Sequence, residues 1–169
     1  MDNRKYMIWV IVLSVAAAAG IVYIYGMTLK ALLYAIVSLC LVAIAVEDAM
    51  TCEIHDMLLG CLLVLGIASY FIETDIGAAD RIIGALCVSL PMFGLGTVMK
   101  NSLGIGDVFL CCFGGFLLGW EKICFAAMTA CLAAGIYAAG MLILKRKELD
   151  ESFAFGPFIC GGMWIMILV

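Results

Sequence analysis

The sequence predicts an all-α, polytopic membrane protein with about seven transmembrane helices. Hydrophobic residues make up 67% of the chain and charged residues only 13%, whereas soluble domains run near half apolar and a quarter charged. The apolar residues also form long blocks separated by short polar clusters, which is the pattern of helices that cross a bilayer. At this length we expect one integral-membrane domain, 1–169.

Each apolar block is long enough for one membrane helix. The first block follows Arg4 and Lys5 and exceeds the roughly 7–15 apolar residues of a signal peptide, so we expect a helix there. Pro91 lies in the middle of the fourth block, and we expect it to kink that helix, as membrane helices tolerate. The expected helices are 7–25, 31–46, 57–72, 82–99, 108–120, 123–144 and 153–169.

The distribution of lysine and arginine predicts the orientation in an inner (plasma) membrane. With the N-terminus in the cytoplasm and the C-terminus outside, more positive residues are cytoplasmic than external, which satisfies the positive-inside rule. The cytoplasmic set is Arg4, Lys5, Lys100, Lys145, Arg146 and Lys147. The outer set is Lys30, Arg81 and Lys122. No basic run indicates a nucleic-acid partner.

This orientation brings two aspartates to the cytoplasmic face. Asp48 ends the second expected helix and Asp107 begins the fifth. A carboxylate in a membrane helix is costly, by about 2.5–3.5 kcal/mol at the helix centre and less near the interface. Two carboxyl groups that approach one another share a proton and together supply a base and an acid, as in aspartic proteases, without a metal or cofactor. Spacing alone equally allows interfacial carboxylates that cap helices and face water.

Other hydrolytic schemes lack their residues in this sequence. There is one histidine, and neither a G-x-S-x-G nor an H-E-x-x-H motif occurs. The nine cysteines include no C-x-x-C pair, so neither a zinc site nor a disulfide framework is expected. A small transporter or proton-coupled channel that uses the same carboxylates is the alternative. It predicts acidic groups near mid-membrane and inverted repeats, and neither is visible here.

Three segments resemble the type IV prepilin peptidases. The G-x-G-D motif of membrane aspartyl proteases is matched at 104–107, the segment at 48–56 looks like the first-aspartate segment, and Phe-Gly-Pro-Phe at 155–158 resembles the C-terminal F-G-P-F segment. Presenilin-type proteases share G-x-G-D, but their Tyr-Asp pair and Pro-Ala-Leu segment are missing here. The resemblance implies a six-helix peptidase core after an added N-terminal helix, with Asp48 and Asp107 as the catalytic pair. It also implies supporting residues: Gly104, Gly106, Thr51, Ile54, Gly156 and Pro157.

The resemblance implies a substrate class, and the sequence differs from the family pattern at two positions. The substrates are prepilins or related proteins, whose basic leader stays in the cytoplasm while an apolar helix follows in the bilayer. His55 stands where the family has a proline, and it is a possible modulator of the pair. Phe109 stands where a lysine is usual. The zinc-binding loop that accompanies N-methylation in larger members has no counterpart, so we expect leader cleavage without methyl transfer.

Overall fold

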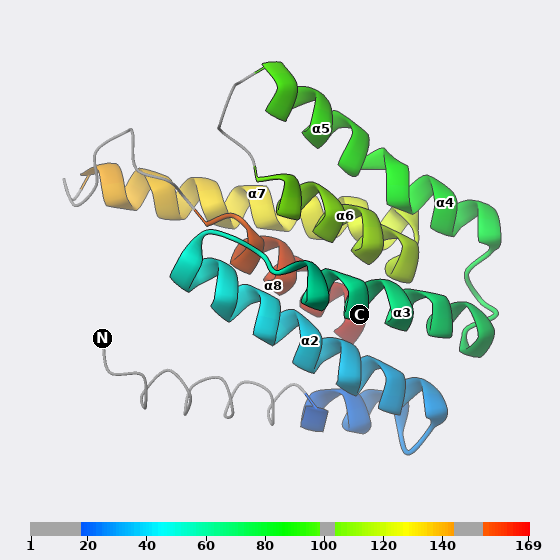
Figure 1. The fold of residues 1–169 in the computed structure, drawn as a ribbon. Helices are drawn as coiled ribbons and strands as arrows, with labels where there is room; N and C mark the ends of the chain where they lie inside the picture. The colour runs from blue at the N-terminus through cyan, green and yellow to red at the C-terminus, as the bar shows by residue number, and fades with distance from the viewer. Residues whose placement is uncertain (1–17, 99–103, 144–153) are drawn as a thin grey trace.

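The computed structural model describes residues 18–98, 104–143 and 154–169, and every regular element in these ranges is α-helical (Figure 1). The all-α prediction is therefore confirmed. A helical stretch at 18–25 comes first. It is followed by α2 (Leu29–Thr51), α3 (Asp56–Ile72), α4 (Ala78–Cys87), α5 (Ser89–Val98), α6 (Ile105–Leu118), α7 (Trp120–Ile143) and α8 (Gly156–Leu168).

Several of these helices are suited to a bilayer. Leu29–Thr51, Ala78–Val98 and Trp120–Met141 are long and apolar enough to cross a membrane, and α3, α6 and α8 are shorter apolar helices. The chain is thus a multi-pass membrane protein, while the count of seven spans stays a prediction. The first part of the first expected helix, 7–17, and the positive residues of the predicted cytoplasmic set lie outside the described residues.

Several expected helix boundaries were wrong. The expected helix 82–99 is two helices, which meet at Val88. Pro91 has no N–H and its ring conflicts with the carbonyl of Cys87, four residues earlier, so the helix is interrupted before the proline. Because α4 begins at Ala78, Arg81 lies in a helix and not in an outer loop. Glu121 and Lys122, expected in a turn, belong to the first turn of α7.

The central helix is α6, which contacts α3, α4, α5, α7 and α8. Its Leu110, Cys111 and Leu117 are completely or almost completely buried. The last helix, α8, contacts both α2 and α7, and it runs alongside α2 in Figure 1. This arrangement brings the end of α2, the start of α6 and the start of α8 to the same end of the bundle.

Glycines allow α4 and α6 to pack backbone against backbone. A Cβ added to Gly84 would lie 2.5 Å from the carbonyl oxygen of Gly115 and 2.7 Å from the carbonyl carbon of Gly119. A Cβ on Gly115 would collide with the Gly84 carbonyl in the same way. Small residues at such crossings are how helices approach closely in lipid, where no hydrophobic effect drives association.

A completely buried arginine joins α3, α4 and α6. The Arg81 guanidinium donates to the Ser69 hydroxyl at 2.6 Å and to the backbone carbonyls of Ser69, Glu73, Phe116 and Leu117 at 3.2–3.3 Å. Its nearest carboxylate contact, from Nη2 to Oε2 of Glu73, is 3.9 Å. Carbonyl oxygens thus supply most of the compensation that a buried cation requires.

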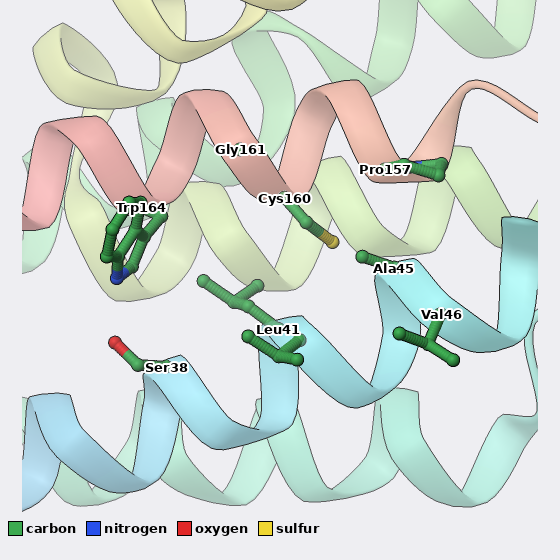
Figure 2. Close-up of a pocket in the computed structure, with 9 residues that line it drawn as sticks. Ser38, Leu41, Ala45, Val46, Pro157, Cys160, Gly161 and Trp164 are labelled. Atoms are coloured by element: carbon green, nitrogen blue, oxygen red, sulfur yellow. The ribbon is translucent and has the colours of Figure 1, made fainter. Parts of the chain in front are cut away.

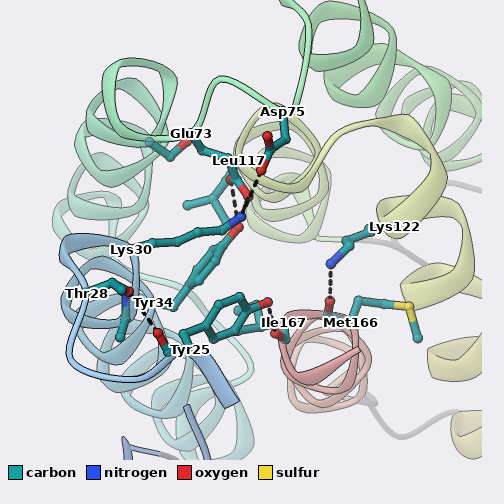
Figure 3. Close-up of polar contacts among 12 residues, drawn as sticks. Tyr25, Thr28, Lys30, Tyr34, Glu73, Asp75, Leu117, Lys122, Met166 and Ile167 are labelled. Carbon is teal, nitrogen blue, oxygen red and sulfur yellow. Dashed lines mark hydrogen bonds and ion pairs between the residues drawn. The ribbon is translucent and has the colours of Figure 1, made fainter. Parts of the chain in front are cut away.

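Glu73 extends this network to α2 (Figure 3). Its carboxylate lies 2.6 Å from the Lys30 ammonium and accepts a hydrogen bond of 2.7 Å from the Tyr34 hydroxyl. Lys30 also contacts Asp75 at 3.4 Å. Lys30 is 18 residues before Asp48 on the same helix, or about 27 Å at 1.5 Å per residue. The charged network and the two aspartates therefore occupy opposite ends of the bundle.

Gly84→Ala is expected to destabilise the protein because its methyl group would enter the backbone of α6. Overpacking of this kind costs about 1–3 kcal/mol, which thermal unfolding in detergent would detect as a lower midpoint. Gly135→Ala in α7 is the matched control, because a Cβ there meets nothing within 4 Å and alanine favours the helix. Equal midpoints for the two variants would contradict the close crossing.

Candidate active site

Asp48 and Asp107 line the same cavity, of about 240 Å³, between the end of α2 and the start of α6. Both side chains are buried. The other lining residues belong to the loop after α2 and to the start of α6: Cys52, Glu53, Ile54, Gly104, Ile105 and Gly106. The structure thus brings together two carboxyl groups that are far apart in the sequence.

Asp48 lies in the last turns of α2 because that helix continues beyond its expected end to Thr51. Cys52 ends it in the left-handed conformation, with φ of 54°, and its N–H donates to the Asp48 carbonyl at 2.8 Å. The side chain of Asp48 also accepts a hydrogen bond, from the backbone N–H of Gly156 to Oδ2 at 2.8 Å. This bond ties α8 directly to the carboxylate.

Gly156 can make this contact because it has no side chain. A Cβ at this position would lie 2.7 Å from Oδ2 of Asp48, closer than non-bonded atoms approach. Pro157 follows in the first turn of α8, where its missing N–H costs no helical hydrogen bond. The Phe-Gly-Pro-Phe segment therefore both starts the helix and delivers a donor to Asp48.

Asp107 lies in the first turn of α6, where a helix N-terminus favours negative charge. Its side chain is 8% exposed, and Oδ1 has no hydrogen-bond partner among the described residues. The two aspartates therefore differ, because Asp48 has a backbone donor and the buried Oδ1 of Asp107 has none.

Of the two motif glycines, Gly106 allows a close approach. Gly104 is the N-cap of α6 with an ordinary φ of −68°, and neither it nor Gly106 has a positive φ. A Cβ on Gly106 would lie 3.2 Å from the Cβ of Ile54, so the loop after α2 packs against the first turn of α6 there. This contact joins the two segments that carry the aspartates.

The loop from Thr51 to His55 is held by its own polar contacts. The Thr51 hydroxyl contacts the carbonyl oxygens of Glu47 and Glu53, each at 2.9 Å. Glu47 contacts His55 twice, through Nδ1 at 2.5 Å and through the backbone N–H at 3.4 Å. His55 is largely exposed and does not line the cavity. Nothing in the sequence pattern predicts Glu47 as the partner of His55.

Phe109 faces away from this cavity. It does not line the cavity, it is partly exposed, and its ring stacks on Phe113 with centroids 5.8 Å apart. The residue that stands in place of the family's usual lysine is therefore part of an aromatic surface.

The arrangement suits acid–base chemistry on a bound water. The cavity is open at one side and holds several times the roughly 30 Å³ that a water occupies in the liquid. Asp48 has a donor that favours its ionised form, and Oδ1 of Asp107 is buried without a donor from residues 18–98, 104–143 or 154–169. Among the described residues, no group of three or more histidine, cysteine or acidic side chains could hold a metal ion.

Comparison with known proteins identifies the family. The family model described as "Type IV leader peptidase family" matches residues 35–139. A protein of Aeromonas salmonicida named prepilin leader peptidase/N-methyltransferase is 28% identical over 92% of this chain and 54% of its own length. A protein of the same name from Pectobacterium carotovorum is 28% identical over 94% of this chain and 58% of its own. A protein of the same name from Pseudomonas aeruginosa is 25% identical over 92% of this chain and 56% of its own length.

The match covers the helices that carry both aspartates. The chain spans about half the length of the curated relatives that it matches. No solved structure matches it significantly. Since the family model covers well over half of the sequence, the chain belongs to the type IV leader peptidase family.

Proposed function

We propose that this protein is a membrane-embedded aspartic endopeptidase that removes the basic leader from prepilins or prepilin-like proteins. The observation that carries the proposal is the shared cavity of Asp48 and Asp107, in which a backbone donor is directed at Asp48, while Oδ1 of Asp107 has no partner in the described part of the chain. Relatives with the printed name prepilin leader peptidase/N-methyltransferase support the substrate class. The family match favours this function over the transporter or channel alternative.

The difference between the two aspartates supports separate roles, with one as the general base and the other as the general acid. Asp48, which accepts the Gly156 N–H, is the base that takes a proton from water as the water attacks the scissile carbonyl. Asp107, whose buried Oδ1 has no partner in the part of the chain that the structure describes, holds the shared proton and gives it to the carbonyl oxygen. The tetrahedral intermediate then collapses as Asp48 gives its proton to the departing amine, and a hydroxyl proton of the intermediate returns to Asp107. No covalent intermediate with the enzyme is needed in this scheme.

The charge distribution supports an active site at the cytoplasmic face, with the N-terminus in the cytoplasm and the C-terminus outside. Lys30 lies at the start of α2, at the opposite end of that helix from Asp48. Lys122 begins α7 and donates to the carbonyl of Met166 near the end of α8 (Figure 3). Both lysines thus belong to the end of the bundle away from the aspartates, which is the external end in this orientation. The larger set of lysines and arginines, Arg4, Lys5, Lys100, Lys145, Arg146 and Lys147, is then cytoplasmic, as the positive-inside rule expects.

Asp48→Asn and Asp107→Asn are each expected to abolish leader removal. Loss of general acid–base catalysis lowers the rate by about 10²–10⁴, so a co-expressed prepilin from the same genome would keep its leader. Gel mobility and mass spectrometry of the product measure this outcome. The matched control is Asp56→Asn, a nearby exposed carboxylate in the first turn of α3, which should cleave normally. Full cleavage by either active-site variant would refute the dyad.

The mass of the cleaved product also tests the expectation of a peptidase without methyl transfer. The mature N-terminus should have the mass of the free amine. A mature N-terminus that carries an added methyl group would show that the chain also transfers methyl groups.

Gly156→Ala is expected to lower kcat because the new methyl group displaces the Asp48 carboxylate. Misplacing a catalytic group by about 1 Å can cost about 10²-fold in rate. Leader cleavage by purified protein in detergent measures the effect. Gly60→Ala in α3, where a Cβ meets nothing within 4 Å, is the control. A Gly156→Ala variant with unchanged kcat would show that the donor to Asp48 is dispensable.

A further inference from the structure

A second cavity lies between α2 and α8 (Figure 2). It is an open groove of about 170 Å³. Its walls come from residues spaced three or four apart, and thus from one face of each helix. They are Ser38, Leu41, Val42, Ala45, Val46, Pro157, Cys160, Gly161 and Trp164.

One end of this groove, which we call the α2/α8 groove, lies close in the chain to the candidate active site. Val46 and Pro157 line that end. Val46 is two residues before Asp48, and Pro157 follows Gly156, whose N–H donates to Asp48 at 2.8 Å. The other end, at Ser38, is ten residues before Asp48 on α2, or about 15 Å along the helix. The groove therefore runs from the neighbourhood of Asp48 toward the middle of the membrane-spanning part of α2.

The far end contains two buried polar atoms without partners. Ser38 is 1% exposed, and neither its hydroxyl nor the indole N–H of Trp164 has a hydrogen-bond partner among the described residues. In Figure 2 the two groups point toward one another across the groove. An unpaired buried polar group is costly. An occupant that offers a polar side chain at this depth would remove that cost, whereas a lipid acyl chain would not.

We propose that the α2/α8 groove binds the apolar segment that follows the scissile bond of the substrate. This inference rests on the proposed function, because a leader peptidase must hold a bond that lies directly beside such a segment. The groove is too small for a helix but takes one or two apolar side chains, as in knobs-into-holes packing between helices. The substrate segment lies along the surface of α2 and α8, with a polar side chain near Ser38 and Trp164.

Gly161 provides the first test because a Cβ there meets nothing within 4 Å. Gly161→Leu would fill the groove without disturbing its walls. We expect KM for a full-length prepilin to rise about tenfold, the effect of losing a packed side chain, while kcat stays the same. A soluble peptide that contains only the leader and the scissile junction should be cleaved as by the wild type. Gly60→Leu, on an open position of α3, should leave both substrates unaffected.

Two results of this experiment would overturn the assignment. One is an unchanged KM for the full-length prepilin with Gly161→Leu. The other is an equal loss of activity on the soluble peptide, which would place the defect at the catalytic pair. A wild-type protein that cleaves no prepilin counts against the proposed function instead, and the next experiment does not depend on cleavage.

Photo-crosslinking in the inactive Asp107→Asn background identifies the occupant directly. A benzophenone amino acid at Val42, inside the groove, should crosslink to the apolar segment of a co-expressed prepilin. The same probe at Ile36, which is 44% exposed and lies about 120° around α2, should react with lipid. Crosslinks from Val42 to lipid alone, or to residues 1–17 of this chain, would overturn the proposal.

Discussion

The Arg81 guanidinium is the group on which the packing of this bundle depends. A cation that is completely buried in an apolar protein is tolerated only if the surrounding structure supplies acceptors. Here the acceptors come from α3 and from the end of α6, and Glu73 passes the contact on to Lys30 and Tyr34 of α2. The need to pair this one buried charge therefore joins α2, α3, α4 and α6 at one end of the bundle.

At the opposite end of the bundle, the buried carboxylates need hydrogen-bond donors, and they receive only some of them from the described residues. Asp48 receives one backbone donor, while Oδ1 of Asp107 has no partner among the described residues. Buried polar groups in proteins are usually paired, and exceptions concentrate at sites that do chemistry. The network around Arg81 stabilises the scaffold, and Oδ1 of Asp107 is the buried acceptor that the proposed function would use.

The sequence was sufficient to predict the helical class, the family and the two aspartates that meet in one cavity, because hydropathy and motif residues are local properties. The contacts that define the site are tertiary and have no sequence signal. Nothing in the pattern around Gly156 shows that its N–H reaches a carboxylate more than a hundred residues away. Arg81 was misassigned to a loop because a positive charge beside polar residues is typical of a helix boundary. Its shielding by the carbonyls of Phe116 and Leu117 depends on packing alone.

The acceptors of Arg81 also bear on how the chain enters the membrane. Ser69 and Glu73 precede it in the sequence, whereas Phe116 and Leu117 are synthesised later. A helix with an arginine near its start inserts poorly alone, at a cost of up to about 2.5–3.5 kcal/mol. The end of α3 is available as soon as α4 emerges from the ribosome, so the two helices can partition into lipid as one hairpin. Integration of α4 thus depends on the helix before it, and α6 completes the shielding afterwards.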